Sequence, residues 1–352
     1  MNIDLKFFAV RPEDAPDDVA EARDLLATSG LDFDNHIELL VVCRGDGRLV
    51  ACAGLDHNII KCVAVAREFR GDSLSLRLGS EIISVAAQMG RFRLFLYSMP
   101  HNRHLFRGWG FYPLVEVPGV VILMENSPLA LQRYCDSLRS QRVAGERIGC
   151  AVLNANPFTL GHQYLLERAA AECDWLHVFV VKEDASTFSY ADRFAMVADG
   201  VKKIPKVTLH PGSEYIISRA TFPGYFLKDK KPIAHIRAAI DLLLFRDHIA
   251  PALAINHRYV GTEPFDSVTK LYNADMEYWL QRAPSRAPVI KVVEVQRTSM
   301  DGNAISASAV RQLLSQCGMH SIEKLVPATT LEILERTYSA KSQLAVAGDD
   351  QT

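Results

Sequence analysis

The chain has 352 residues, of which 49% are hydrophobic and 23% charged, a balance typical of globular proteins of a length that suggests two domains. Its formal net charge is −2, which argues against a nucleic-acid partner bound through a basic surface. The first residues lack a signal-peptide pattern, and no apolar run reaches the roughly 18–20 residues of a spanning helix. We therefore expect a cytoplasmic protein with no membrane partner.

The first 125 residues predict an α+β domain. Apolar residues at helical spacing predict a helix over 74–88, and β-branched residues predict a central strand over 59–65. The other elements expected here are a helix at 16–29, strands at 38–44, 48–56 and 93–97, a short helix around 105–107 and a strand at 119–124.

The order of these elements resembles that of a GNAT acyltransferase domain. Arg70-Gly71-Asp72-Ser73-Leu74-Ser75 lies where that family carries Arg-x-x-Gly-x-Gly/Ala, and residues 105–111 resemble its late Tyr-x-x-x-Gly-Phe segment. The family's glycines let backbone N–H groups approach a pyrophosphate, whereas this chain has Ser73 and Ser75. We expect either a retained acyltransferase site or coenzyme-binding groove, or a fold kept for structure or for docking a partner.

A linker helix and polar linker are expected over 126–147, followed by a second domain over 148–338. Its first strand, 148–153, is a short apolar run typical of a buried parallel strand. Strands then alternate with helices, which predicts a doubly wound parallel sheet. The remaining elements expected are strands at 176–181, 206–209, 254–260 and 289–295, and helices at 191–200, 234–249 and 266–281. The small, polar residues 339–352 predict a disordered tail.

The seven cysteines are scattered, and none forms a Cys-x-x-Cys pair. Cys43, Cys52 and Cys62 lie in apolar, strand-like stretches, and Cys317 lies on the apolar stripe of a predicted helix. Buried, reduced thiols are the favoured interpretation, over disulfides or zinc.

The first strand of the second domain runs into Asn154-Ala155-Asn156-Pro157-Phe158-Thr159-Leu160-Gly161-His162, which opens a helix. His162 would lie in the first turn, where backbone N–H groups and the helix dipole favour an anion. Gly161 would let the chain approach a phosphate, and Thr159 and His162 would donate to an α-phosphate under attack. Asn154 and Asn156 are expected to orient substrate or phosphate. Alone, so short a pattern also arises by chance, and His162 would then only cap the helix.

A second segment, Ile305-Ser306-Ala307-Ser308-Ala309-Val310-Arg311, also stands at a predicted helix start. Serines there are ordinary N-caps. Arg311, one turn later, would offer a fork of donors to the β- and γ-phosphates, together with Ser306 and Ser308. Paired with the first segment, it predicts a site that holds pyrophosphate.

Further candidate site residues each have a plainer alternative. Lys182 follows the second strand and would meet the attacking acid or the α-phosphate, unless it is a surface lysine. Arg193 is a candidate nucleotide-binding residue, unless it is a surface charge on a helix. Gly261 and Thr262 would line the adenine or ribose pocket and Glu263 would bind a hydroxyl or metal-bound water, unless the segment is an ordinary strand-to-helix turn.

The two segments resemble the paired Thr/His-x-Gly-His and Ile-Ser-x-Ser-x-x-Arg signatures of the nucleotidyltransferase superfamily. With stretches at 220–226, 260–264 and 269–273, they resemble the citrate lyase ligase family over the chain up to residue 335. The resemblance implies that ATP and acetate give acetyl-adenylate and pyrophosphate, and that the acetyl group passes to the thiol of the phosphopantetheine-like arm on the citrate lyase acyl carrier subunit. Mg²⁺ should bridge the phosphates with few protein ligands, and no His/Cys/Asp cluster indicates zinc.

Two other functions stay open. An adenylyltransferase would join AMP to a phosphate-bearing substrate, as in coenzyme A or NAD synthesis, and would release a dinucleotide. A nucleotide-sensing or carrier-docking module would bind ATP without releasing pyrophosphate. The full set of Thr159, His162, Ser306 and Arg311 favours an enzyme over a sensor.

Overall fold

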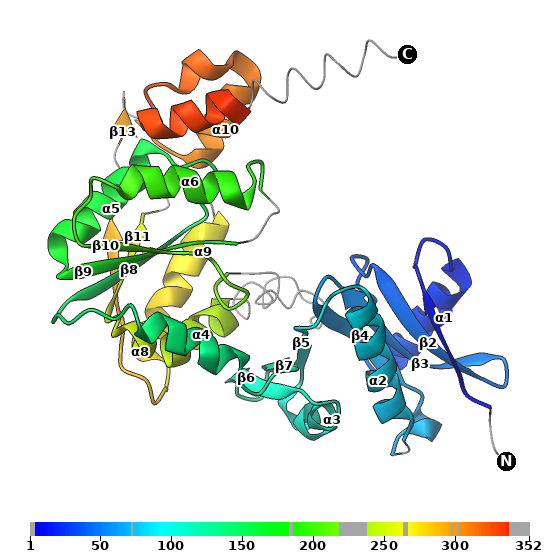
Figure 1. Ribbon diagram of the computed structural model, residues 1–352. Coiled ribbons are helices and arrows are strands. Elements are labelled where there is room, and N and C mark those ends of the chain that lie inside the picture. Colours follow the sequence, from blue (N-terminus) through cyan, green and yellow to red (C-terminus); the bar gives the residue numbers. More distant parts are fainter. Residues whose placement is uncertain are drawn as a thin grey trace, which may run out of the picture. The chain divides into compact units, whose positions relative to one another are not determined.

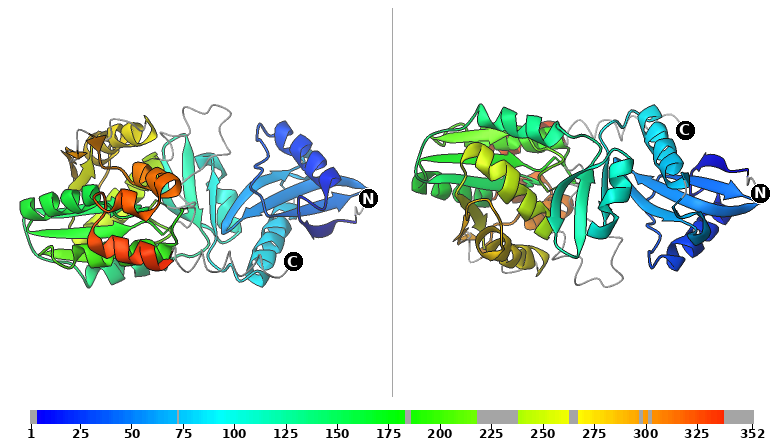
Figure 2. Two further views of the ribbon diagram at one scale, coloured as in Figure 1. Left: turned by 90° about the horizontal axis from the view of Figure 1, so that it is seen from above. Right: turned by 90° about the horizontal axis from the view of Figure 1, so that it is seen from below.

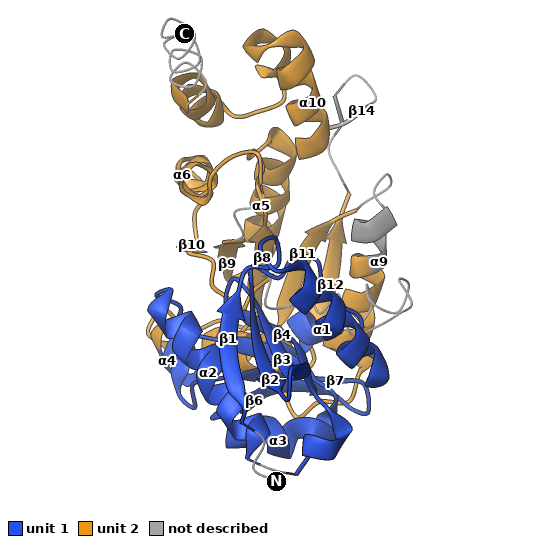
Figure 3. Cartoon of the chain, turned by 90° about the vertical axis from the view of Figure 1, so that its right-hand side faces the viewer, with its two compact units in different colours: residues 1–136, 219–244 blue, residues 137–218, 245–352 orange. Residues whose placement is uncertain are grey.

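The computed structural model describes residues 4–71, 73–182, 186–217, 238–262, 267–296, 299–300 and 303–337. The chain divides into two compact units: residues 1–136 and 219–244 form unit 1, and residues 137–218 and 245–352 form unit 2 (Figure 3). The domain limits expected from the sequence differ from this division and stay a prediction. Glu263 and the tail expected over 339–352 lie outside the described residues.

Unit 1 contains a seven-stranded mixed sheet in the order β1-β2-β3-β4-β5-β7-β6 (Figure 1). The strands are β1 (Lys6–Val10), β2 (Leu39–Gly45), β3 (Arg48–Asp56), β4 (Ile59–Val65), β5 (Phe95–Ser98), β6 (Tyr112–Val117) and β7 (Val121–Glu125). β4 is the central strand, as its β-branched residues predict. It is antiparallel to β3 and parallel to β5. Ile59 and Ile60 of β4 form the pairing with β5.

Two helices cover opposite faces of this sheet. Alternate residues of a strand face opposite sides, and in β2 Val41 packs in a core with α2 (Leu74–Gln88). Its neighbour Val42 packs in a second core with α1 (Pro16–Thr28). α3 (Arg103–Gly108) is a shorter helix of unit 1, and α4 (Ala130–Arg139) begins in unit 1 and ends in unit 2.

Unit 2 contains a five-stranded parallel sheet in the order β10-β9-β8-β11-β12. The strands are β8 (Ile148–Leu153), β9 (Trp175–Val180), β10 (Val207–His210), β11 (His257–Gly261) and β12 (Lys291–Val295). The helices α5 (Leu160–Glu172) and α6 (Tyr190–Val201) join β8, β9 and β10 in one direction, and the chain then returns to β11 on the other side of β8. Because crossovers are right-handed, this reversal puts helices on both faces. α8 (Ala250–Leu253) and α9 (Ser267–Met276) lie opposite α5 and α6 (Figures 1 and 2).

The reversal at β8 determines where a ligand can bind. Doubly wound sheets bind ligands in the crevice outside the carboxyl ends of the strands, where the strand order reverses. The first motif follows β8, Lys182 follows β9, and Gly261 ends β11. All three therefore lie at the same edge of the sheet.

The predicted fold class is confirmed, since an α+β sheet domain is followed by a doubly wound parallel sheet. β1, β6 and the hairpin of β13 (Ser299–Met300) and β14 (Asn303–Ala304) were not predicted. All seven cysteines are described and free, and six are buried. Cys317, at the end of α10 (Ala307–Cys317), is exposed, contrary to the burial expected from the apolar stripe. No helix among the described residues has the length and apolarity to cross a membrane.

Candidate active site

His162 is held by the residue that caps its own helix. Thr159 is the N-cap of α5, and its Oγ1 accepts a hydrogen bond from the backbone N–H of His162 (3.3 Å). In return, the backbone N–H of Thr159 donates to Nδ1 of His162 (3.0 Å). Because Nδ1 accepts this bond, the ring proton lies on Nε2. The histidine therefore presents a donor at its second nitrogen, as its predicted role requires.

A buried aromatic ring supports the imidazole of His162. Phe158 stacks on it with a centroid separation of 5.7 Å and an interplanar angle of 15°. Phe158 packs in turn on α6 at Gly200, where a Cβ would come within 2.3 Å of the ring. Sequence reasoning missed both supporting residues. The available signal was a glycine inside a predicted helix, where it costs about 1 kcal/mol relative to alanine and calls for a packing reason.

The second motif contacts the first through Arg311. Ser306 is the N-cap of α10 and accepts from the backbone N–H of Ala309 (3.1 Å). Arg311 lies one turn later, and its Nη1 donates to the backbone carbonyl of Asn156 (2.5 Å). Its Nη2 donates to Oγ of Ser308 (3.1 Å). The two segments predicted to act together are therefore hydrogen-bonded to each other.

The backbones of the two motifs also touch. A Cβ on Gly161 would lie 2.9 Å from the carbonyl oxygen of Ile305, so glycine leaves the space that this approach needs. The sequence predicts that Gly161 admits a phosphate, and the structure adds contact between the motifs as a second reason. The side chain of Asn156 is also held in place, because its Oδ1 accepts a hydrogen bond from the backbone N–H of Phe188 (3.2 Å).

Arg193 is fully buried on α6 and contacts three backbone segments of unit 2. Its Nη1 donates to the carbonyl oxygens of Asn154 (2.8 Å) and Val181 (2.8 Å), and to Oδ1 of Asn154 (3.0 Å). Its Nε donates to the carbonyl of Phe188 (3.2 Å). The alternative of a surface charge is therefore wrong, while direct contact with a nucleotide stays a prediction.

Lys182 lies just past the carboxyl end of β9. Its side chain is 52% exposed, and its Nζ lies 3.1 Å from Oε1 of Glu214. Its backbone packs on Gly212, where a Cβ would come within 2.5 Å of the Lys182 nitrogen. The ammonium group thus has a carboxylate partner, which an incoming acid or phosphate would have to replace. Its role toward substrate stays a prediction.

Gly261 and Thr262 are fixed at the same sheet edge. The carbonyl of Gly261 accepts from Nδ2 of Asn273 (3.2 Å), and the backbone N–H of Thr262 donates to Val295 (3.0 Å). These bonds hold the end of β11 against α9 and β12. The pocket role of both residues therefore stays a prediction, as does that of Glu263.

The assembled edge suits an anion. Two helix N-termini supply backbone N–H groups and the positive ends of their dipoles. His162, Ser306, Ser308, Arg311 and Lys182 can all donate hydrogen bonds. Such a donor set fits a polyphosphate, whose own oxygens would hold a Mg²⁺ ion more readily than these side chains would. This chemistry suits the phosphates of a nucleoside triphosphate, and binding of one by these residues stays a prediction.

One of the two serines in the unit 1 segment that resembles the GNAT motif makes an internal contact. Ser75, in the first turn of α2, accepts from Nε1 of Trp109 (3.2 Å). The indole lies against Gly79, where a Cβ would come within 2.4 Å of the ring. Ser73 is the N-cap of α2 and makes no capping hydrogen bond. The two hypotheses for unit 1, an acyl site or a fold kept for structure or docking, both stay predictions.

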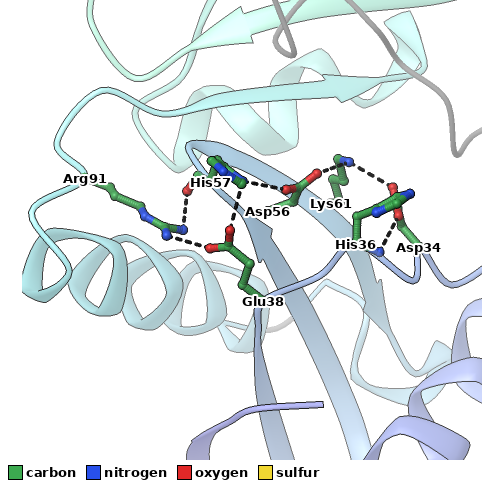
Figure 4. Close-up of polar contacts among 7 residues, drawn as sticks. All are labelled: Asp34, His36, Glu38, Asp56, His57, Lys61 and Arg91. Atoms are coloured by element: carbon green, nitrogen blue, oxygen red, sulfur yellow. Dashed lines mark hydrogen bonds and ion pairs between the residues drawn. The ribbon is translucent and has the colours of Figure 1, made fainter. Parts of the chain in front are cut away.

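A second polar cluster of unit 1, the hairpin cluster, gathers around the β3–β4 turn (Figure 4). It comprises Asp34, His36, Glu38, Asp56, His57, Lys61 and Arg91. Nδ1 of His57 lies 2.9 Å from Glu38 and 3.0 Å from Asp56, a spacing that a metal ion could also use. Lys61, however, pairs with Asp56 (2.6 Å), and Arg91 pairs with Glu38 (2.5 Å). Both carboxylates are thus already paired with protein cations, so we interpret the cluster as an ion-pair network.

The charge state of Asp56 supports this interpretation. Burial alone would raise its pKa, but hydrogen bonds from Lys61 and His57 outweigh burial and hold the pKa below its ordinary value. The carboxylate is therefore ionised and paired inside unit 1. Lys61 also lies 2.8 Å from Asp34, so one buried ammonium group joins two carboxylates.

Comparison with known proteins assigns the family. A family model described as citrate lyase ligase C-terminal domain matches residues 148–334. "[Citrate [pro-3S]-lyase] ligase" of Escherichia coli K12 is 48% identical over 329 residues, which cover 94% of each chain. The Klebsiella pneumoniae protein of the same name is 47% identical over 90% of this chain and 92% of its own. A solved structure of Thermotoga maritima TmcAL with alpha-thio ATP covers 55% of this chain and 56% of its own, at 14% identity and a TM-score of 0.35, too low to bear on function. On its sequence relatives, the chain belongs to the citrate lyase ligase family.

Proposed function

We propose that this chain is an ATP-dependent, AMP-forming acid–thiol ligase. It activates acetate as acetyl-adenylate and acetylates the thiol of the phosphopantetheine-like arm on the acyl carrier subunit of citrate lyase. The names of its relatives support the ligase activity. The acid, the adenylate and the carrier thiol come from the family resemblance.

In the first step, a carboxylate oxygen of acetate attacks the α-phosphorus of ATP. The bond from that phosphorus to the bridging oxygen of the β-phosphate breaks, and pyrophosphate leaves. Nε2–H of His162 donates to the α-phosphate oxygens as charge builds on them, and Arg311 with Ser306 and Ser308 holds the leaving pyrophosphate. The protein supplies position and charge neutralisation, and no covalent enzyme intermediate is needed.

In the second step, the sulfur of the carrier arm attacks the acetyl carbonyl carbon. The thiol proton passes to solvent water, the bond from that carbon to the phosphate oxygen breaks, and AMP leaves as the acetyl thioester forms. We propose Lys182 as the group nearest the acid, where its ammonium would exchange the Glu214 carboxylate for that of acetate.

The observation that carries the proposal is the junction between the two motifs. Arg311 bonds to Asn156 and Gly161 packs against Ile305, which supports a site where both helix N-termini bind the same anion. A protein that needed only one phosphate contact would not need this junction. Two donor sets side by side suit a reaction in which one phosphate is attacked while pyrophosphate is held.

Pyrophosphate exchange into ATP over a panel of small carboxylic acids tests the reaction class and the substrate together. We expect exchange that depends on acetate and falls roughly a hundredfold to a thousandfold in His162→Ala, the usual loss for one aimed donor. His320→Ala is the matched control, because that side chain is 94% exposed in unit 2. Near-normal pyrophosphate exchange in His162→Ala would contradict the proposed ligase site. A dinucleotide product would favour an adenylyltransferase.

A further inference from the structure

The amide of Asn154 has a fixed orientation. Asn154 follows β8 and is exposed, and its Oδ1 accepts from Nη1 of Arg193 (3.0 Å) and from Oγ of Ser186 (3.4 Å). The guanidinium of Arg193 can only donate, so the oxygen and not the nitrogen of the amide must face it. The Nδ2 group, with its two N–H bonds, consequently points to the other side of the amide.

Arg193 is placed to impose this orientation. Its side chain is fully buried, and it bonds the carbonyls that follow β8 and β9 and the one that precedes α6. One planar guanidinium thus fixes the loop of Asn154 and the direction of its side chain together. Its Nε makes one bond and its Nη1 makes three, all to protein oxygens, so neither nitrogen has an N–H left for a ligand.

We propose that Arg193 is a positioning residue and that it acts through Asn154, whose Nδ2 group donates to the phosphates of ATP. This inference rests on the proposed function and refines it. The guanidinium turns an amide, which has both a donor and an acceptor end, into a one-sided donor at the edge where α5 begins. An anion gains from a donor and is repelled by an acceptor, so the orientation decides whether Asn154 helps or hinders.

A double-mutant cycle tests whether Arg193 acts through Asn154. The variants are Asn154→Ala, Arg193→Lys and both together, and the measurement is the Kd of ATP with Mg²⁺ by calorimetry. We expect each single change to weaken ATP binding roughly tenfold to a hundredfold, the range for a hydrogen bond to a charged group. The double variant should bind no more weakly than the weaker single variant. Independent, multiplying losses would overturn the proposal, as would single variants that bind ATP normally.

Asn154→Asp separates the donor from the structural contact. The aspartate keeps an acceptor for Arg193, so thermal stability should stay the same or rise. It offers no donor and adds negative charge, so ATP affinity should fall below that of Asn154→Ala. If Asn154 had only a structural role, Asn154→Asp would bind ATP as the wild type does, because its contact with Arg193 is preserved. That result would overturn the proposal.

Arg246 supplies a matched control for loss of a buried guanidinium. It is 3% exposed and donates to the carbonyls of Trp279, Ala283 and Pro288 in unit 2. Arg246→Lys should lower the melting temperature as Arg193→Lys does and leave the Kd of ATP unchanged. An equal loss of ATP affinity in both variants would assign the effect to general destabilisation and would overturn the proposal.

The double-mutant cycle measures ATP binding alone, so it requires no carboxylic acid substrate. If the wild-type protein binds ATP but shows no acid-dependent pyrophosphate exchange, the proposed ligase reaction is contradicted. The double-mutant cycle still tests the role of Arg193 in that case. A wild type that binds no ATP would overturn both.

Discussion

At the scale of single residues, the candidate site depends on three glycines of unit 2. A Cβ would meet the carbonyl of Ile305 at Gly161, the ring of Phe158 at Gly200, and the backbone after β9 at Gly212. None of the three has a positive φ. Glycine is therefore needed at these positions because a side chain would not fit. The backbone torsions are ones that other residues could also adopt.

Gly161→Ala should force the two motifs apart. The Cβ would stand 2.9 Å from a backbone oxygen, which cannot rotate away as a side chain can. We expect the free energy of unfolding to fall by about 1–3 kcal/mol, the usual cost of overpacking, and ATP affinity to fall with it. Chemical denaturation and calorimetry would measure both.

Gly108→Ala is the control for this change. Its Cβ would meet only the flexible end of Leu76, at 3.1 Å, and helical alanine is favoured over glycine by about 1 kcal/mol. Stability should be kept or increased, and ATP affinity should not change. If Gly161→Ala also left ATP affinity unchanged, contact between the motifs would not matter for binding.

At the scale of elements, a buried histidine pair joins the strands β9 and β10. Nδ1 of His177 lies 2.9 Å from Nε2 of His210, both side chains are buried, and Phe179 stacks on His210 at 4.5 Å. Burial lowers the pKa of His177 from 6.5 to about 4. Burial, and then the charge of His177, lowers the pKa of His210 to about 3. The folded protein therefore keeps both rings neutral at neutral pH.

Unit 2 should lose stability as the pH falls below 6.5. From there down to about 4 for His177 and about 3 for His210, the unfolded chain binds protons that the folded pair does not. The free energy of unfolding should drop by up to about 1.4 kcal/mol per pH unit for each histidine. Urea denaturation at a series of pH values would measure the slope.

The slope should become shallower in His210→Gln, which removes one titrating group, even if that variant is less stable at every pH. His320→Gln should keep the wild-type slope, since His320 is 94% exposed. A wild-type slope in His210→Gln would mean that the buried pair does not govern the acid sensitivity.

Most elements could be predicted from local patterns. The helix over 74–88 and the strand over 148–153 have the predicted bounds, because Leu74, Leu78 and Ile82 repeat at helical spacing and the strand is a bounded apolar run. β1 escaped prediction since it pairs only with β2 and most of its residues are exposed. This edge strand has no clean alternation, and its apolar run, Phe7 to Val10, has only four residues, the shortest length that indicates a strand.

The candidate donors could be named from the sequence, whereas the residues that support them could not. The motif spacing indicates His162 and Arg311 as candidates, because helix starts that bind anions need donors in the first turn. Nothing local indicates that Arg193 is buried beneath backbone carbonyls, or that Gly161 meets Ile305. Contacts between residues so far apart in the chain leave no periodic signal, and only the folded backbone reveals them.

At the scale of the whole molecule, each unit has its own apolar cores. One core lies in unit 2, between the parallel sheet and α5, α6 and α10. Unit 1 has separate cores on the two faces of its sheet. Every described residue of the candidate ATP site belongs to unit 2. The two units therefore need not respond alike to a nucleotide.

Hydrogen–deuterium exchange with and without ATP and Mg²⁺ should show this division. We expect slower exchange at 154–162 and 305–311, where backbone N–H groups would bind phosphate, and no change in the strands of unit 1. Protection that appears in the unit 1 sheet instead would assign the nucleotide site to unit 1.

The junction between the motifs has a consequence for how the protein is made. Asn156 leaves the ribosome 155 residues before its partner Arg311. During that interval the nascent chain has the strand, the turn and the first helix of the site, but neither the guanidinium nor the second helix start. A cell therefore makes most of this chain before any of it can hold pyrophosphate, and premature termination anywhere between the two motifs leaves a protein with half a site.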